Sequence, residues 1–145
     1  MNSKHISLHE FTTIHNLQTE DVLENKTCIS ITDICQNSIV LSPNWGGTLS
    51  LKFYDIDLKS HPQCFKKEQA IEVINFMLLV FKSGYDELII HCHAGISRSA
   101  AFHNFFQYYI VKNQNIIDNP PKFIGNSLVY SLLVETYKEL FEQDI

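Results

Sequence analysis

The chain has 145 residues, of which 45% are hydrophobic and 19% are charged, and its formal net charge is −5 at pH 7. This length suits one domain with a buried core, and we predict a single domain over residues 1–145. No apolar run is long enough to cross a membrane, and residues 1–10 lack the pattern of a signal peptide, so we expect a cytoplasmic protein. The negative charge gives no general basic field, so neither a nucleic acid nor a membrane is expected as a partner.

The four cysteines, Cys28, Cys35, Cys64 and Cys92, are spread along the chain at irregular spacing. No Cys-x-x-Cys pair occurs, and this spacing does not predict a disulfide framework in a domain of this size. Most free cysteines are small buried hydrophobic residues, and we expect this of Cys28 and Cys35.

Short elements make up the first part of the chain. We predict a short strand over Lys4–Leu8 and a short helix over His9–Leu17. Cys28–Thr32 has the β-branched alternation that is typical of a strand. After turn residues at Ser42–Gly47, apolar and polar side chains alternate over Thr48–Tyr54, which predicts another strand.

Longer elements follow. Helical spacing of apolar residues predicts a helix over Lys66–Lys82, with Gly84 just past its end. The short apolar run Glu87–His91 indicates a buried strand. Ser99–Val111 is apolar nearly all round, as expected of a helix at the centre of a domain.

The last predicted elements are a loop at Asn119–Pro121 and an amphipathic helix over Ser127–Phe141. Asn126 or Ser127 is the expected N-cap of this helix. Because predicted strands alternate with predicted helices, the chain is expected to form an α/β domain.

The stretch His91–Ser99, with sequence HCHAGISRS, contains the only arginine of the chain, Arg98. It comes where a buried strand passes through a loop of small residues into a helix. Successive N–H groups in such a loop, with the positive end of the helix dipole, form an anion-binding nest. These groups favour the thiolate form of Cys92. The planar guanidinium of Arg98 can hold two oxygens of a tetrahedral anion, which lysine cannot do.

A cysteine and an arginine separated by five residues, preceded by His91 and followed by Ser99, resemble the signature of the cysteine-dependent protein tyrosine phosphatases. The stretch looks most like the dual-specificity enzymes and the small bacterial or viral members. Leu51–Asp55 resembles the strand that leads to the family's general acid, and Gly125–Leu133 resembles the start of the final helix. The resemblance implies a single catalytic domain with a central, mostly parallel sheet of about four or five strands flanked by helices.

The resemblance also implies roles for individual residues. Cys92 would attack phosphorus, and Asp55 would protonate the leaving oxygen. Ser99 would assist the departure of the thiolate, and His91 would orient the loop. Phosphate oxygens would be held by the Arg98 side chain and by the N–H groups of the loop residues His93, Ala94, Gly95, Ile96, Ser97 and Arg98. No metal and no cofactor are implied, and the partner would be a phosphorylated protein.

Several alternatives stay open on the sequence alone. Asp57 competes with Asp55 for the role of acid, since continued strand alternation would point both the same way. A shallow site favours dual specificity, but the sequence does not separate phosphotyrosine from phosphoserine and phosphothreonine. The same loop chemistry also suits an RNA 5′-triphosphate or a phosphoinositide. A zinc-binding module built from His61, Cys64 and His91–His93 is less favoured, because it leaves Arg98 without a role.

Overall fold

The structure is a computed structural model and describes residues 1–112 and 125–141. Within them, β1 (Asn2–Ile6), β2 (Lys26–Thr32), β3 (Gly47–Lys52) and β4 (Glu87–His91) form one sheet in the order β1-β4-β2-β3. All three strand pairings are parallel. The expected α/β class, with a parallel sheet flanked by helices, is therefore confirmed. Because the strands are parallel, their carboxyl ends meet along one edge of the sheet.

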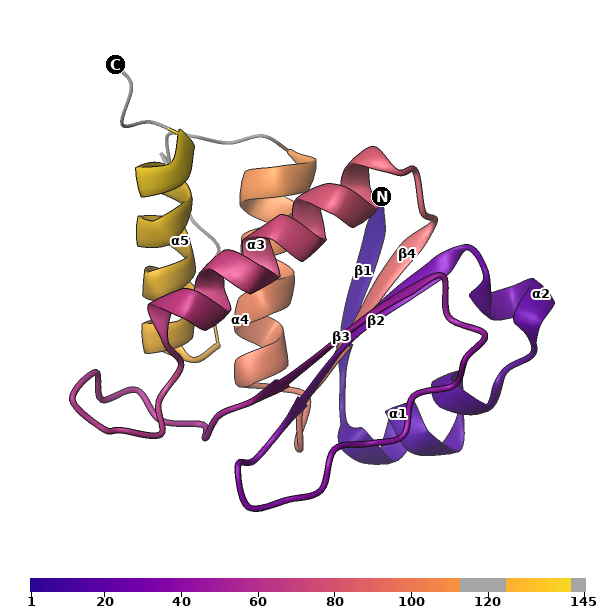
Figure 1. Ribbon diagram of the computed structural model, residues 1–145, viewed down its shortest axis with the longest axis horizontal. Helices are drawn as coiled ribbons and strands as arrows, with labels where there is room; N and C mark the ends of the chain where they lie inside the picture. The colour runs from indigo at the N-terminus through magenta and orange to yellow at the C-terminus, as the bar shows by residue number, and fades with distance from the viewer. Residues whose placement is uncertain (113–124, 142–145) are drawn as a thin grey trace.

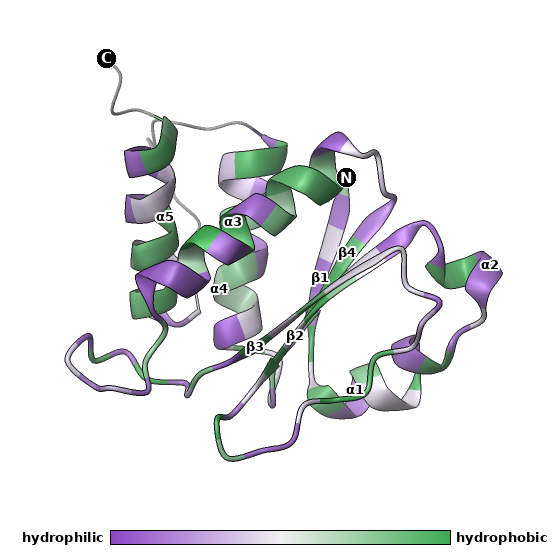
Figure 2. Ribbon diagram, viewed as in Figure 1, coloured by the Kyte–Doolittle hydropathy of each residue, from purple (hydrophilic) through white to green (hydrophobic). Residues whose placement is uncertain are grey.

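Helices lie on both sides of this sheet (Figure 1). One side carries α1 (Leu8–Thr13), the 3-10 turn η1 (His15–Leu17) and α2 (Glu20–Leu23). The other side carries α3 (Lys67–Lys82), α4 (Arg98–Phe105), its continuation η2 (Phe106–Val111) and α5 (Ser127–Phe141). Figure 2 shows apolar and polar residues alternating around α3, as expected of a helix with one face against the core.

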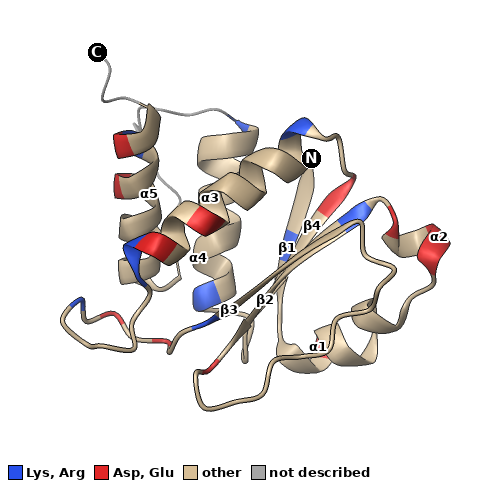
Figure 3. Cartoon of the chain, viewed as in Figure 1, with Lys and Arg blue, Asp and Glu red and all other residues tan. Residues whose placement is uncertain are grey.

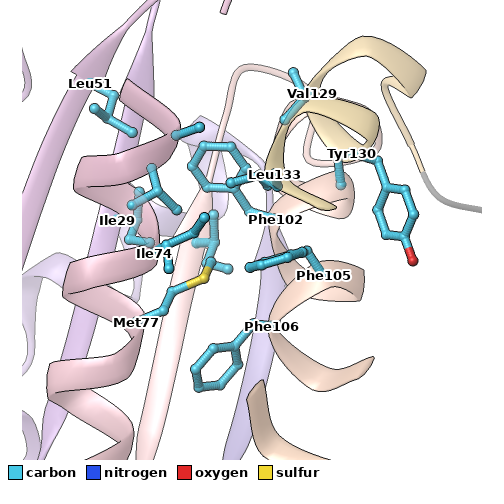
Figure 4. Close-up of a cluster of buried hydrophobic side chains, with 14 of the residues drawn as sticks. Ile29, Leu51, Ile74, Met77, Phe102, Phe105, Phe106, Val129, Tyr130 and Leu133 are labelled. Carbon is cyan, nitrogen blue, oxygen red and sulfur yellow. The ribbon is translucent and has the colours of Figure 1, made fainter. Parts of the chain in front are cut away.

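The central strands β2 and β4 are buried on both faces because alternate side chains enter two different cores. Ile29 and Ile90 face the larger core, between the sheet and the helices α3, α4 and α5. Phe102 and Phe105 of α4 and Phe106 of η2 point into this core beside Ile74 and Met77 of α3. All five side chains are fully buried (Figure 4). Cys28 and Ile89 face the smaller core, where they meet Phe11 of α1 and Leu23 of α2.

Differences from the predicted elements are concentrated before β2. The first strand ends at Ile6, and the helix predicted over His9–Leu17 is interrupted at Ile14. The hydroxyls of Thr12 and Thr13 donate to the carbonyls of Leu8 and His9 at 3.0 and 2.7 Å, and such bonds compete with the regular helix. The single helical turn of α2 was not predicted.

Later elements follow the predictions more closely. The strand Glu87–His91 and the helix Ser127–Phe141 have the predicted bounds, and the Asn126 side chain caps that helix by accepting from Val129 N–H at 3.0 Å. The helix predicted over Ser99–Val111 begins at Arg98 and widens into a π-helical turn at Phe106. The loop predicted at Asn119–Pro121 lies outside the described residues.

Two further predictions concern the cysteines and the membrane. Cys28 is buried as expected, but Cys35 is exposed, because β2 ends before it and its loop leaves the core. Over the two described ranges, no helix combines the length and the apolar character that crossing a membrane requires.

Candidate active site

A cavity of about 520 Å³ lies where the carboxyl ends of the strands meet. Cys92 follows β4, Asp33 follows β2, and Tyr54 and Asp55 come shortly after β3. All four residues line the cavity, together with Arg98 at the start of α4. Figure 3 shows a basic residue at that helix end and an acidic residue at the end of β2. In open parallel sheets this edge is where ligands bind.

Most residues that the sequence assigned to the loop line this cavity. They are Cys92, His93, Ala94, Ile96, Ser97 and Arg98. Gly95 does not line it, but its N–H donates to the sulfur of Cys92 at 3.2 Å. Ser99 does not line it either, and its hydroxyl lies 3.1 Å from the same sulfur. The Cys92 side chain is almost wholly buried, so the cavity is its route to an external ligand.

Hydrogen-bond donors from other parts of the chain hold the loop, and the acceptors are carbonyl oxygens of the loop residues. The donors are Leu8 N–H to His93 at 3.1 Å, the His5 ring to Gly95 at 2.7 Å, and the N–H groups of Ala101 and Asn126 to Ser97, both at 3.1 Å. In a trans peptide the next N–H points opposite to the carbonyl. The N–H groups of Ala94, Ile96 and Arg98 therefore point away from these donors. They have no acceptor among residues 1–112 and 125–141, and all three residues line the cavity.

Gly95 allows the loop to lie against the first strand. Its φ is +80°, a conformation that side chains with a Cβ disfavour. A Cβ at this position would meet the carbonyl carbon of Ile6 and the nitrogen of Ser7, each at 2.5 Å. The Cys92 N–H donates to the Ile6 carbonyl at 3.4 Å from the same side. The end of β1 therefore packs directly against the backbone of the loop.

Arg98 is buried, with 4% of its side chain exposed, and its charge is balanced by Asp33. Its Nη1 donates to Asp33 Oδ1 at 2.9 Å and to the Phe53 carbonyl at 2.6 Å. Its Nε–H is buried and has no partner in the described part of the chain. A buried donor without an acceptor is costly, and an anion oxygen in the adjoining cavity would supply the acceptor.

Asp55 and Asp57, the two candidates for the acid, lie in different places. Strand β3 ends at Lys52, so strand alternation does not extend to Asp55 and Asp57. Asp55 lines the cavity of Cys92, whereas Asp57 does not line that cavity and lies with Asp55 at a neighbouring one. The Oδ1 atom of Asp55 accepts from Ser97 Oγ at 2.7 Å and from Asn126 Nδ2 at 2.8 Å. The second carboxyl oxygen of Asp55 has no hydrogen-bond partner within the ranges 1–112 and 125–141.

His91 is buried and does not line the cavity. Burial lowers its pKa to about 4, and the positive charge of Arg98 contributes in the same direction. The ring is therefore neutral near pH 7. Its Nδ1–H donates to the Cys92 carbonyl at 3.4 Å, so its Nε2 accepts from the Ser30 hydroxyl at 2.6 Å. The residue fixes one end of the loop to the middle of the sheet.

Two contributors to the site were missed by sequence reasoning. Asp33 follows the predicted strand Cys28–Thr32 directly, and its place at the carboxyl end of a parallel strand was an available signal. His5 offered no such signal, because its contact with Gly95 depends on the pairing of β1 with β4.

No group of three or more His, Cys, Asp or Glu side chains that could hold a metal ion occurs in the ranges 1–112 and 125–141. The residues of the alternative zinc site therefore do not form a ligand set there. The cavity combines a thiol, inward N–H groups and a guanidinium. This arrangement can bind a tetrahedral anion and present a nucleophile to its central atom.

The contact beneath Gly95 can be tested against Gly84, which has a similar φ of +77° but nothing within 4 Å of its Cβ position. We expect Gly84→Ala to cost about 1–2 kcal/mol of unfolding free energy, from the left-handed backbone alone. Gly95→Ala should cost roughly a further 1–3 kcal/mol, because its methyl group is forced against β1. Urea denaturation of both variants measures the difference, and equal losses would contradict the close approach.

Comparison with known proteins adds no assignment to this geometry. A scan against protein-family models finds no match, and a search of curated proteins finds no related protein. The chemistry of the site must therefore be judged from its own residues.

Proposed function

We propose that this protein is a cysteine-dependent phosphatase with a tyrosine phosphatase-like fold, and that it hydrolyses phosphate monoesters on protein. The observation that carries the proposal is the convergence of the Cys92 thiol and the Arg98 guanidinium on one cavity. Between them, the anchored carbonyls of the loop leave N–H groups directed toward the same space. Phosphate has the tetrahedral oxygens and the negative charge that such a set of donors fits.

In the first chemical step, the Cys92 sulfur forms a bond to phosphorus while the bond from phosphorus to the ester oxygen breaks. Asp55 gives its proton to the departing oxygen, which leaves as a neutral hydroxyl. The loop N–H groups and Arg98 stabilise the charge on the three remaining phosphoryl oxygens. The product of this step is a phosphocysteine.

In the second step, a water molecule attacks phosphorus and gives its proton to the Asp55 carboxylate. The bond between sulfur and phosphorus breaks, and the electron pair returns to the Cys92 sulfur. The 3.1 Å contact between this sulfur and the Ser99 hydroxyl supports a role for Ser99, which would stabilise the departing thiolate by donating to it. Inorganic phosphate then leaves, and the enzyme regains its starting state.

The charges around the cavity favour a substrate with a single phosphate group. Its described lining contains one cation, Arg98, and two carboxylates, Asp33 and Asp55, while Asp57 lines the adjoining cavity. The further phosphates of an RNA 5′-triphosphate or a phosphoinositide would meet these carboxylates without lysines to balance them. Tyr54 and Ile96 also line the cavity and offer apolar surface to the ring of an aryl phosphate.

The central test compares Cys92→Ser with Cys64→Ser, a buried thiol outside the cavity. We expect Cys92→Ser to abolish hydrolysis of an aryl phosphate and to keep the binding of tungstate, because it removes only the nucleophile. Cys64→Ser should keep both. Arg98→Lys should lose most activity and most tungstate affinity, since an ammonium cannot reproduce the guanidinium fork. Steady-state kinetics and titration calorimetry measure these effects, and full turnover by Cys92→Ser would refute the mechanism.

The acid is tested with the matched variants Asp55→Asn and Asp57→Asn. We expect Asp55→Asn to slow a substrate with a poor leaving group, such as phenyl phosphate, by roughly 10²–10⁴-fold. An activated substrate such as 4-nitrophenyl phosphate should be slowed far less, because its leaving oxygen needs little protonation. Asp57→Asn should leave the ratio of the two rates unchanged. The reverse pattern would assign the acid to Asp57.

The substrate class is tested with a panel at low ionic strength. It contains peptides with phosphotyrosine, phosphoserine or phosphothreonine, a 5′-triphosphate RNA, and vesicles that carry a phosphoinositide. We expect kcat/KM to be highest for the phosphotyrosine peptide, and higher when lysine rather than glutamate flanks the phosphorylated residue, because the surrounding carboxylates repel further negative charge. Preferred hydrolysis of the RNA or the lipid would show that the charge argument fails.

A further inference from the structure

The first strand makes a contact with the loop that the proposed mechanism does not use. His5 is the fourth residue of β1, which pairs in parallel with β4, and its ring lies partly buried beside the loop. Its Nδ1 atom lies 2.7 Å from the Gly95 carbonyl oxygen. Because a carbonyl can only accept, Nδ1 must carry the proton. This is the shortest hydrogen bond that the structure gives from outside the loop to a loop carbonyl.

The bond fixes one particular peptide group. The Gly95 carbonyl and the Ile96 N–H belong to the same trans peptide and point in opposite directions. When His5 holds the carbonyl on the outer side, the Ile96 N–H is directed to the opposite side, and Ile96 lines the cavity. A loop without this bond could rotate the peptide about the flexible backbone of Gly95.

The His5 ring is itself held in place. The ring of His103, from α4, packs against it with centroids 5.0 Å apart. Nδ1 of His103 lies 2.7 Å from the Ser3 hydroxyl, which also accepts from Gln107 Nε2 at 2.8 Å. The Ser3 hydroxyl therefore joins β1 to the helix α4 and its continuation η2. These contacts give the His5 donor one fixed direction.

We propose that His5 is a positioning residue, which holds the Gly95–Ile96 peptide so that the Ile96 N–H binds an oxygen of the substrate phosphate. The inference rests on the proposed function for the identity of the anion. It extends the site to the first strand of the sheet, which lies on the opposite side of the loop from the cavity. It also gives a physical role to a histidine that contacts no substrate.

The test compares His5→Phe, which keeps the ring without the donor, with His5→Asn, whose side-chain amide can place a donor near the Nδ1 position. We expect His5→Phe to lose about tenfold in both kcat/KM for an aryl phosphate and affinity for tungstate, the scale of one positioned hydrogen bond. His5→Asn should stay within about threefold of the wild type. Lys4→Ala is the control, because it removes the ion pair from β1 to Glu87 of β4, at 3.6 Å, and touches neither His5 nor the loop. It should lower the thermal unfolding midpoint and leave both site measurements unchanged in the folded protein.

The outcomes separate the two proposals. If His5→Phe matches the wild type in tungstate affinity, or if His5→Asn and Lys4→Ala lose as much as His5→Phe, the positioning role is overturned. If the wild type binds tungstate but hydrolyses no phosphate ester, the proposed function fails, and the His5 comparison is decided on tungstate affinity alone. A wild type that binds no tungstate overturns both. If His5→Phe does not fold, His5→Ala gives the same comparison without added bulk.

Discussion

A buried positive charge organises the carboxyl edge of the sheet. Arg98 has only 4% of its side chain exposed, so its guanidinium requires partners from the protein. Asp33 supplies a carboxylate from the end of β2, and the Phe53 carbonyl supplies a second acceptor from the chain that follows β3. The start of α4 is thereby tied to two strands that are distant in sequence. The Nη1 atom of Arg98 donates to both of these partners, whereas its Nε–H has no acceptor in the described part of the chain.

The loop between Cys92 and Arg98 is shaped by contacts on its outer side. Its carbonyl groups are bound by donors from β1, the turn into α1, α4 and the cap of α5. Each bound carbonyl also determines the direction of the next N–H group, because the peptide bond is planar and trans. The donors that face the cavity are thus aligned before any ligand arrives. Such preorganisation is the main source of electrostatic stabilisation in enzyme sites.

The sequence predicted the residues of this site that lie within one short stretch of the chain, and it missed two residues that come from distant strands. Cys92 and Arg98 lie on one short strand–loop–helix unit, and their spacing was sufficient to place them together. The α/β class and the bounds of β4 and α5 also followed from local periodicity. Asp33 and His5 were missed because their contacts with the loop depend on strand order, which periodicity does not encode.

The choice between Asp55 and Asp57 shows a second limit of local patterns. Periodicity gave no preference, because it assumed that the strand continued through both residues. The strand ends at Lys52, and the chain then turns, with Ile56 N–H donating to the Tyr54 carbonyl at 2.9 Å. Only the path of this irregular segment decides which carboxylate shares a cavity with Cys92.

The outer anchors of the loop have a kinetic consequence. His5 and Gly95 are 90 positions apart in the chain, and Asp33 and Arg98 are 65 apart. Closing such long segments is slow and comes after local helices have formed. We therefore expect the loop to take its final shape only when the edge strand β1 has docked, late in folding. By the same reasoning, fraying of β1 would disable the site while most of the sheet is still intact.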